Sequence, residues 1–227
     1  MDHFLTKQIS YQHTPRHLRL NFNRPHLSLS SAVLNGGLIS ANGFVNLKVD
    51  QSPDSTESPA QTLARYCQQQ AWQGTTVGMM TAASMSSLRI AKKRHQNIDI
   101  VVMVTSGLSN PRRAGDKAEY QLMSTAEYEI GTINMLALTS ATLTEAAMAE
   151  ALMMATEAKT VVLHAHEIKS SISNAIATGT GTDSCAIVSA YDGQPVTYCG
   201  KHVMFGEILA QLVIEALSAS IAWKSAR

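Results

Sequence analysis

One eight-residue run, 177–184, limits the fold more than any other part of this 227-residue chain. It reads Ala-Thr-Gly-Thr-Gly-Thr-Asp-Ser, so it offers almost no apolar surface for a core. Strongly apolar segments flank the run, and Asp183 is its only charged residue. Glycine permits positive φ angles and close approach to a ligand, while hydroxyl and N–H groups can converge on a developing negative charge. The run therefore predicts a connection between core elements that is either a plain surface turn or part of a site.

The low charge of the chain argues against several classes of partner. Only 15% of the residues are charged, the formal net charge is +1, and aromatic residues make up 5%. These values give no electrostatic case for nucleic acid or an anionic membrane, and few side chains on which bases could stack. We expect neither partner. Hydrophobic residues make up 45% of the chain, which is enough for a large core, and the methionine-rich apolar stretches leave room for a homo-oligomer.

The cysteines and the N-terminal residues favour a cytoplasmic protein. Cys67, Cys185 and Cys199 are widely spaced and form no CxxC pair, so neither a disulfide framework nor a zinc knuckle is indicated. Residues 1–10 carry charges and no continuous apolar run, and no window of about 18 apolar residues appears. We expect a reducing compartment, no signal peptide and no membrane span.

Hydrophobic periodicity predicts the fold class α/β (α+β). We expect a single domain over residues 1–227, with a mixed, largely antiparallel sheet layered with helices. The expected strands are 18–22, 27–34, 44–49, 75–83, 98–105, 130–138, 185–190 and 195–198, and the expected helices are 59–72, 143–166 and 206–223. Residues 1–15 are expected to be irregular, 50–58 to form a polar loop, and the basic segment 84–97 to be an exposed connection.

Cap and turn residues mark several boundaries. Ser58 followed by Pro59 and Gln61 has the pattern of a capping box at a helix start, and Thr142 with Glu145 has the same pattern. Asn-Gly-Gly at 35–37 predicts a turn.

Generic catalytic motifs do not explain the chain. Gly179-x-Gly181-x-x-Ser184 resembles a dinucleotide fingerprint, but a helix is expected before it and a strand after it, which is the wrong order. His164 and His166 lie on a predicted helix, where positions two apart point in different directions, so one metal ion is not expected there. Cys185 and Cys199 lie in apolar strand patterns, which favours buried structural thiols.

A set of polar residues remains at the ends of predicted elements. They are Asn35, Asn42, Asn110, Arg113, Asp116, Asn134, Glu157, Lys159, Asp183 and His202. If these ends meet, they form a pocket rich in carboxylate, amide and hydroxyl groups. Such a pocket suits amide or ester hydrolysis, in which a carboxylate or imidazole activates water and N–H or O–H donors hold the oxyanion.

Several of these segments, taken in order, resemble the adenosylcobinamide amidohydrolase (CbiZ-type) family. The resemblance runs from about Leu34 to Ala216. It is carried by 35–37 (NGG), 76–83 (TVGMMTAA), 109–116 (SNPRRAGD), 131–134 (GTIN), 155–160 (ATEAKT), 177–184 (ATGTGTDS), 200–202 (GKH) and 206–207 (GE). Two positions depart from the pattern: Pro111 stands where a small residue is expected, and Val203-Met204 replaces a Thr-containing pair. Both departures adjoin the predicted site loops and bear on substrate choice.

The resemblance implies an enzyme of corrinoid salvage. Such an enzyme cleaves the amide that joins the aminopropanol arm to the corrin ring of adenosylcobinamide, giving adenosylcobyric acid and 1-aminopropan-2-ol. The expected partner is therefore a small-molecule corrinoid substrate, and the resemblance implies no cofactor or metal beyond the cobalt of that substrate. Some members lie beside corrinoid or iron-chelate transport systems, so another physiological substrate remains open.

We assign roles to these residues as hypotheses. Glu157 or Asp183 activates water, His202 or Lys159 protonates the leaving amine, and the 178–182 loop supplies oxyanion donors. The expected substrate-binding residues are Asn35, Gly36, Gly37, Asn42, Asn110, Arg113, Asp116, Asn134, Thr178, Gly179, Thr180, Gly181, Thr182 and Ser184. Glu157 with Lys159 could instead be a helix-surface pair, and His202 a structural histidine.

Two other functions stay open on the sequence. One is a corrinoid-binding or delivery protein without catalysis, which would form a stoichiometric complex and release no aminopropanol. The other is a hydrolase of a different amide metabolite, including a metal-dependent one that uses His164, His166 or Asp183.

Overall fold

The computed structural model describes residues 3–49, 57–118 and 132–225. Its helices are α1 (Pro59–Gln69), the short 3-10 helix η1 (Met85–Ser87), α2 (Glu145–Ala165) and α3 (Met204–Ser225). Its strands are β1 (His3–Phe4), β2 (Ile9–His13), β3 (His17–Ser30), β4 (Gly37–Lys48), β5 (Thr76–Thr81), β6 (Arg89–His95), β7 (Ile98–Ser106), β8 (Pro111–Arg112), β9 (Ile133–Thr139), β10 (Thr142–Leu143), β11 (Gly179–Thr180), β12 (Ser184–Ser189) and β13 (Pro195–Val196).

One long strand, β3, connects two parts of a large mixed sheet. The sheet runs in the order β1-β2-β3-β12-β9-β7-β6, and β4 adds to β3 and then pairs with β5. Most neighbouring strands are antiparallel, whereas β4 with β5 and β9 with β12 are parallel. The register of β3 against β4 shifts between Asn21 and His26. The first half of β3 also pairs with β2, and the second half pairs with β12. The expected mixed, largely antiparallel sheet is confirmed.

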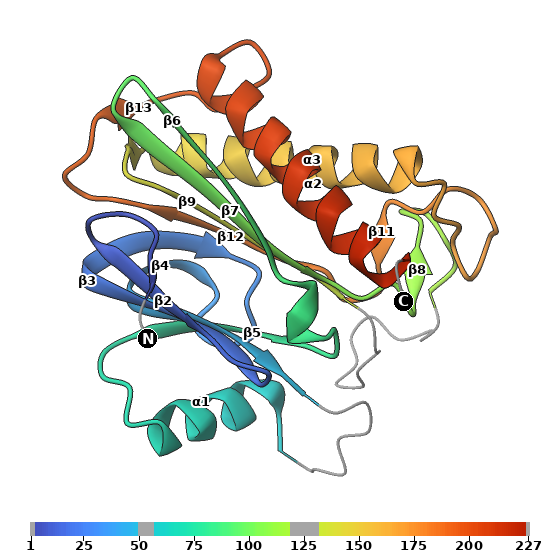
Figure 1. The fold of residues 1–227 in the computed structure, drawn as a ribbon, viewed down its shortest axis with the longest axis horizontal. Coiled ribbons are helices and arrows are strands. Elements are labelled where there is room, and N and C mark those ends of the chain that lie inside the picture. Colours follow the sequence, from blue (N-terminus) through green and yellow to red (C-terminus); the bar gives the residue numbers. More distant parts are fainter. Residues whose placement is uncertain (1–2, 50–56, 119–131, 226–227) are drawn as a thin grey trace.

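The sheet folds back on itself, which gives four layers (Figure 1). Along β7, Val102 and Val104 pack in the same cluster as α2 and α3, while Val101 and Met103 pack against β3, β4 and β5. On the other side of β4 and β5, Leu63 of α1 closes a third apolar cluster. The layers therefore run from α2 and α3, through β6-β7-β9-β12, through β2–β5, to α1. The period-two alternation of a strand buried on both faces explains why β7, β9 and β12 are apolar almost throughout.

The helix caps agree only in part with the sequence prediction. Ser58 forms the expected capping box with Gln61 at the start of α1. The box expected between Thr142 and Glu145 is wrong, because Thr142 belongs to β10 and the Thr144 side chain accepts from the N–H of Ala147 instead. The predicted turn at 35–37 is confirmed, with φ of 52° at Asn35 and 82° at Gly37.

Half of the basic segment 84–97 forms the strand β6, so it is not the exposed connection predicted from its charge. β6 pairs antiparallel with β7 along its whole length and forms one edge of the sheet. Lys92, Lys93 and Arg94 are exposed, while Ala91 is buried against β7 and α3. Charged side chains are common on edge strands because they discourage pairing with another chain. The basic residues therefore lie on an edge strand, which is hydrogen-bonded to β7 on one side only.

Other expected boundaries shift by a few residues. The strands expected at 18–22 and 27–34 are parts of the single strand β3. The strand expected at 130–138 is β9, and its first two expected residues lie outside the described part, as does most of the polar loop 50–58. Residues 1–15, expected to be irregular, include β1 and β2 from His3 onward.

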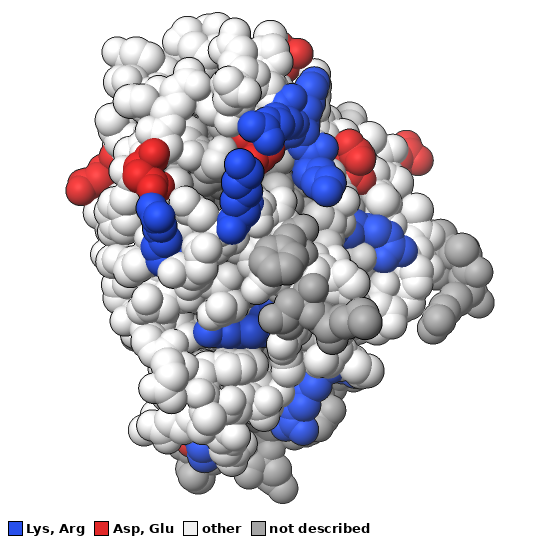
Figure 2. Space-filling model, turned by 60° about the vertical axis from the view of Figure 1, so that its left-hand side comes forward, with Lys and Arg blue, Asp and Glu red and all other residues white. Residues whose placement is uncertain are grey.

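Two features are relevant to possible partners: the charge on the surface and the apolar composition of α3. Figure 2 shows Lys and Arg side chains gathered on one face, with Asp and Glu beside several of them, on a surface that is mostly uncharged. By length and composition, the 20 residues Met204–Trp223 of α3 could cross a membrane, contrary to the expectation that no such window exists. Half of that window is buried, because α3 packs on α2, β6 and β7. A buried core helix has the same composition.

Candidate active site between α2 and the start of β12

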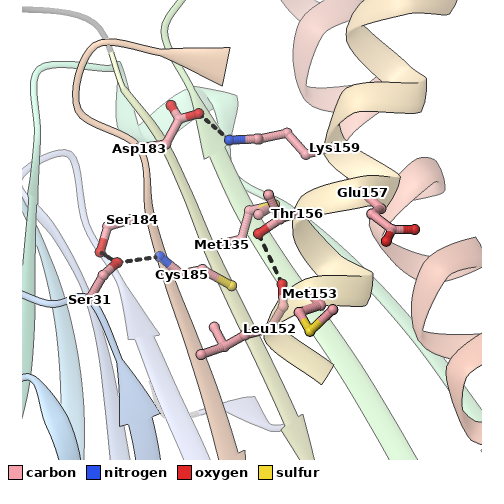
Figure 3. Close-up of a pocket in the computed structure, with 10 residues that line it drawn as sticks. All are labelled: Ser31, Met135, Leu152, Met153, Thr156, Glu157, Lys159, Asp183, Ser184 and Cys185. Carbon is pink, nitrogen blue, oxygen red and sulfur yellow. Dashed lines mark hydrogen bonds and ion pairs between the residues drawn. The ribbon is translucent and has the colours of Figure 1, made fainter. Parts of the chain in front are cut away.

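The centre of the candidate site is an ion pair between Lys159 and Asp183. Lys159 lies in the third quarter of α2, and Asp183 directly precedes β12. The Lys159 Nζ is 2.5 Å from Asp183 Oδ2, and the two side chains are only 10% and 13% exposed. Figure 3 shows them pointing toward one another across the gap between helix and sheet. The structure thus brings together two of the four predicted catalytic residues.

Asp183 accepts three further hydrogen bonds. Its Oδ1 accepts from the N–H of Ile133 at 3.0 Å and from the hydroxyl of Thr180 at 2.5 Å. Its Oδ2 accepts from the N–H of Thr180 at 3.0 Å, in addition to Lys159. The carboxylate therefore joins α2, β9 and β11 at one point.

The glycine at 179 makes room for this ion pair. A Cβ atom at this position would lie 2.3 Å from Asp183 Oδ2 and 2.8 Å from Lys159 Nζ. No real Cβ contact is that short, so any side chain at 179 would displace the pair. A glycine is thus needed at position 179 because the charged groups of Asp183 and Lys159 lie very close to its backbone.

An open groove of about 550 Å³ lies beside the ion pair. Its lining residues come from α2, from β9, from the loop after β3 and from the start of β12 (Figure 3). They are Ser31, Met135, Leu152, Met153, Thr156, Glu157, Lys159, Asp183, Ser184 and Cys185. Leu152 and Met153 of α2 and Met135 of β9 form its apolar wall, and Met153 is 63% exposed there. The groove therefore combines an apolar wall with a charged end, as small-molecule sites commonly do.

Two hydroxyl groups lie on the sheet side of the groove. Ser31 Oγ and Ser184 Oγ are 3.1 Å apart, and Ser31 Oγ also accepts from the N–H of Cys185 at 3.1 Å. One hydroxyl hydrogen is used between the two serines, whichever donates, so these bonds leave the other hydrogen free to donate into the groove. Ser184 was predicted, whereas Ser31 was missed because it stands alone after a strand.

The thiol of Cys185 lines the groove but is held in its neutral form. Burial is the main cause and raises the pKa of the Cys185 thiol to about 12, against a smaller lowering by Lys159. Cys199 is likewise buried, and burial followed by Glu150 raises its pKa to about 12. The expectation that both cysteines are buried structural thiols is confirmed.

The two predicted site loops lie side by side behind the ion pair. β8 and β11 pair antiparallel, with Arg112 opposite Gly179, and the Gly181 N–H donates to the carbonyl of Asn110. The hydroxyl of Thr178 accepts from the N–H of Ala114 at 2.8 Å. The sequence prediction that distant loops meet here therefore agrees with the structure.

Internal hydrogen bonds already occupy much of these loops. The N–H groups of Thr178, Thr180 and Gly181 donate to Arg112 O, Asp183 Oδ2 and Asn110 O. In this arrangement they do not point at a substrate oxyanion. Thr182 contributes its carbonyl, which accepts from Thr132 at 2.5 Å.

Arg113 and Asp116 fasten the 109–116 loop to the loop after α2. Arg113 donates to Ile176 O at 2.9 Å, and Asp116 accepts from Ser170 at 2.5 Å. Hydrogen bonds from Ser170, Ser173 and the Arg113 backbone, in that order, lower the pKa of Asp116. Both side chains therefore hold the loops together at their surface end.

The predicted asparagines lie apart from the groove. Asn134 is 3% exposed and donates to Asn46 Oδ1 and Met80 O, both at 2.8 Å, in the interior between the two sheet layers. Asn35 donates to Thr76 O at 2.8 Å, and Asn42 accepts from the Thr75 N–H at 3.1 Å, so both bind the start of β5. Gly36 and Gly37 complete the turn after Asn35, and Gly37 pairs with Ser30, next to groove residue Ser31.

Glu157 and His202 lie at or beyond the rim. Glu157 lines the groove but points away from the Lys159–Asp183 pair (Figure 3). Its carboxylate forms an exposed ion pair with Lys201. His202 follows in the same turn, is exposed, and has its ring 6.2 Å from that of Tyr198. It is not one of the groove-lining residues. His202 therefore follows Lys201, the ion-pair partner of Glu157, but does not line the groove.

Sequence reasoning missed the apolar wall of the groove. Met135, Leu152 and Met153 look like ordinary core positions of a strand and a helix, and no local pattern separates the exposed ones from the buried ones. Within the described residues, no group of three or more His, Cys, Asp or Glu side chains could hold a metal ion. His164 is exposed in the last turn of α2 and His166 is its C-cap, as expected from the helical pattern.

Comparison with known proteins places the chain in a family. The family described as adenosylcobinamide amidohydrolase matches residues 2–227. An adenosylcobinamide amidohydrolase of Methanosarcina mazei is 24% identical over 193 residues, which cover 84% of this chain and 88% of that protein. An uncharacterised protein of Methanocaldococcus jannaschii is 36% identical over 157 residues, and the match spans 61% of each chain, less than two thirds of that relative.

The solved structures add little. A protein from Pyrococcus horikoshii, 10% identical, matches 95% of this chain and 76% of its own with a TM-score of 0.44, too low to support an argument. The family match extends over nearly the whole sequence and includes every segment that forms the groove. The chain therefore belongs to the adenosylcobinamide amidohydrolase family.

Proposed function

We propose that this chain hydrolyses the amide between the aminopropanol arm and the corrin ring side chain of adenosylcobinamide. The products are adenosylcobyric acid and 1-aminopropan-2-ol, so the reaction serves corrinoid salvage. Family membership supports the amidohydrolase role. The observation that carries the proposal is the groove itself, where an apolar wall of Met135, Leu152 and Met153 lies beside the Lys159–Asp183 pair and the Ser31–Ser184 hydroxyls.

The shape of the groove suits one arm of a large ligand. Its volume of about 550 Å³ is in the range of small-molecule sites but smaller than a complete corrinoid. We therefore propose that the aminopropanol arm enters the polar end, while one apolar edge of the ring rests on Leu152 and Met153. The rest of the corrinoid would remain outside, which an open groove permits.

The groove offers a group for each proton transfer of amide hydrolysis. Glu157, which lines the groove at its rim, turns from Lys201 toward the groove and accepts a proton from water as the new C–O bond forms. The free Ser31 or Ser184 hydroxyl donates to the oxyanion. The ammonium of Lys159 protonates the leaving nitrogen as the C–N bond breaks. The new carboxylic acid then returns a proton to Lys159, and Glu157 passes its proton to the released amine, so that carboxylate and ammonium products balance the water consumed. We prefer Lys159 to His202 because only Lys159 lines the groove.

The direct test is incubation of the purified protein with adenosylcobinamide. We expect adenosylcobyric acid and aminopropanol in equal amounts by mass spectrometry. Glu157→Gln should lower kcat by about 100-fold, the usual loss when a general base is removed. Glu207→Gln on the exposed side of α3 is the matched control, because Glu207 bonds Gln211 away from the groove, and it should leave kcat unchanged.

Three results would overturn the proposal. A stoichiometric complex with adenosylcobinamide and no released amine would indicate a binding or delivery protein instead. Turnover of another amide metabolite with none of adenosylcobinamide would move the chain to a different substrate. Loss of activity with a chelator and recovery with a divalent ion would contradict hydrolysis by the side chains named above.

A further inference from the structure

We infer that Asp183 is a positioning residue that aims Lys159 into the groove, and that Thr180 and Gly179 maintain this arrangement. The inference rests on the proposed function and deepens it, because it gives different roles to two residues to which the sequence assigns proton transfers. It assigns contact with the substrate to Lys159 and gives Asp183 no proton transfer of its own.

The hydrogen bonds of Asp183 leave little capacity for it to act as a base. Two carboxylate oxygens offer about four lone-pair sites, and four donors already occupy them, from Ile133, Thr180 (two) and Lys159. A base must instead accept a proton from water within hydrogen-bond reach. Taking that proton would require Asp183 to give up one of these bonds in a site where its side chain is 13% exposed.

Lys159 has donors to spare. An ammonium has three N–H groups, and Asp183 is the one hydrogen-bond acceptor found for it among the described residues. The side chain lines the groove although the residue is only 8% exposed, so the ammonium sits at the groove's inner end. Two donors are thus available to a substrate amide, and a fixed ion pair reduces the reorganisation that the reaction requires.

Thr180 and Gly179 make the pair rigid. Thr180 holds both oxygens of Asp183 at once, through its N–H and its hydroxyl, which fixes the orientation of the carboxylate plane. Gly179 leaves open the space into which Lys159 and Asp183 extend. Gly179 and Thr180 therefore hold the Lys159–Asp183 ion pair in place, the glycine by leaving space and the threonine by hydrogen bonding.

The test uses variants that separate the charge of Asp183 from the hydrogen bond of Thr180. Asp183→Asn removes the charge, Thr180→Val removes one hydrogen bond, and Thr180→Ser keeps that bond as the matched control. For turnover of adenosylcobinamide we expect Asp183→Asn to lower kcat by about 100-fold and Thr180→Val by about 10-fold, with KM changed less than 3-fold, because positioning acts on the transition state. Thr180→Ser should stay within about 2-fold of the unchanged protein, since the hydroxyl is retained.

A second readout does not depend on turnover. Lys159 is labelled with an amine-reactive acylating reagent at pH 8, and peptide mass spectrometry measures its rate, with the exposed Lys93 of β6 as internal reference. Asp183→Asn releases the amine from the ion pair that fixes it, so the Lys159 rate should rise about 10-fold. Thr180→Val should raise it less, and Thr180→Ser should leave it unchanged.

The outcomes separate the two proposals. If the unchanged protein does not hydrolyse adenosylcobinamide, the proposed function fails, while the labelling rates still decide whether Asp183 controls Lys159. If Asp183→Asn keeps its kcat or labels like the unchanged protein, the positioning role is overturned. If Thr180→Val does not fold, the comparison of Asp183→Asn with Thr180→Ser gives the same decision. An altered pH–rate profile for Asp183→Asn with unchanged labelling would make Asp183 the base and also contradict the inference.

Discussion

At the scale of single residues, environment decides which polar groups of this chain can react. Cys185 and Lys159 line the same groove. Burial keeps the Cys185 thiol protonated, whereas the ammonium of Lys159 has the carboxylate of Asp183 beside it. Ser31 and Ser184 keep one hydroxyl hydrogen for a ligand, whereas the N–H groups of Thr178, Thr180 and Gly181 are occupied. The residue types alone would have ranked these groups differently.

Removal of the Cys185 thiol should leave the chemistry intact. With a pKa of about 12, the thiol has almost no thiolate near neutral pH and cannot serve as a nucleophile. We expect Cys185→Ala to keep kcat within about 3-fold, with at most a modest loss of stability from the small cavity. Iodoacetamide labelling of the folded protein should likewise spare Cys185, and activity lost in step with labelling at this residue would contradict the assignment.

Removal of Lys201 should change turnover little. Lys201 pairs with the half-exposed Glu157 at the rim. An exposed ion pair is screened by solvent, so we expect Lys201→Met to change kcat by less than about 3-fold in a steady-state assay. Lys92→Met on β6 is the control. A loss of kcat comparable to that of Glu157→Gln would show that the ion pair positions Glu157 for the reaction.

At the scale of elements, α1 is docked through a cluster of cationic and aromatic side chains rather than through ion pairs. Arg19 of β3 is 5% exposed, donates to Thr76 Oγ1 at 3.1 Å, and lies 4.5 Å from the ring centre of Trp72. Burial lowers the pKa of Arg19 to about 10. His17 bonds the Tyr66 hydroxyl at 2.8 Å. Aromatic faces thus stabilise a buried cation near α1.

This docking should weaken in acid. Burial, then Arg19, His13 and Arg16, lower the pKa of His17 below its usual value of 6.5. The folded state therefore disfavours the proton that the unfolded chain accepts, so stability is full above about pH 6.5 and falls as the pH drops through the lowered value. We expect urea unfolding at pH 7 and pH 5 to show a smaller loss in His17→Gln than in the unchanged protein. His95→Gln on β6 should leave the loss unchanged. The remaining loss belongs in part to His26, whose pKa burial also lowers.

At the scale of the whole molecule, a buried polar network joins the two sheet layers. Asn46 of β4 donates to Thr105 of β7 at 2.9 Å, and Asn134 of β9 donates to Asn46. These three side chains are at most 3% exposed. Buried amides that are fully hydrogen-bonded fix one relative placement of the layers, which a purely apolar interface would not.

Truncation of Asn134 should therefore destabilise the fold. Asn134→Ala leaves Asn46 Oδ1 and Met80 O without their donor in the interior, which should cost about 2–4 kcal/mol of unfolding free energy. Urea denaturation measures this loss, with the exposed Gln70→Ala as control. A loss below about 0.5 kcal/mol would show that the network does not hold the layers. A purely catalytic defect at unchanged stability would return Asn134 to the substrate-binding set predicted from sequence.

The sequence predicted local features better than the layering. Capping by Ser58, the turn at 35–37, and the helices around 143–166 and 206–223 follow from short-range rules and agree with the structure. β6 was missed because its charge outweighed its weak alternation, and an edge strand tolerates that charge. No local pattern shows that β3 bends between two layers, since that depends on pairing with strands over 150 residues away.

The candidate site was likewise predicted only in part from the sequence. Asp183 and Ser184 stood out because polar groups in a small-residue loop are conspicuous, and they line the same groove as Lys159 of α2, which the sequence also singled out. Ser31 and Met153 were not visible, because only the tertiary arrangement turns an isolated serine and a helical methionine toward the same space.

The two tryptophans of the chain lie in opposite outer layers. Trp72 follows α1 and rests against Arg19, whereas Trp223 lies near the end of α3. Replacing either by phenylalanine would leave one intrinsic fluorophore for each layer. Emission spectra recorded during a denaturant titration could then follow the unfolding of each outer layer separately, without any attached dye.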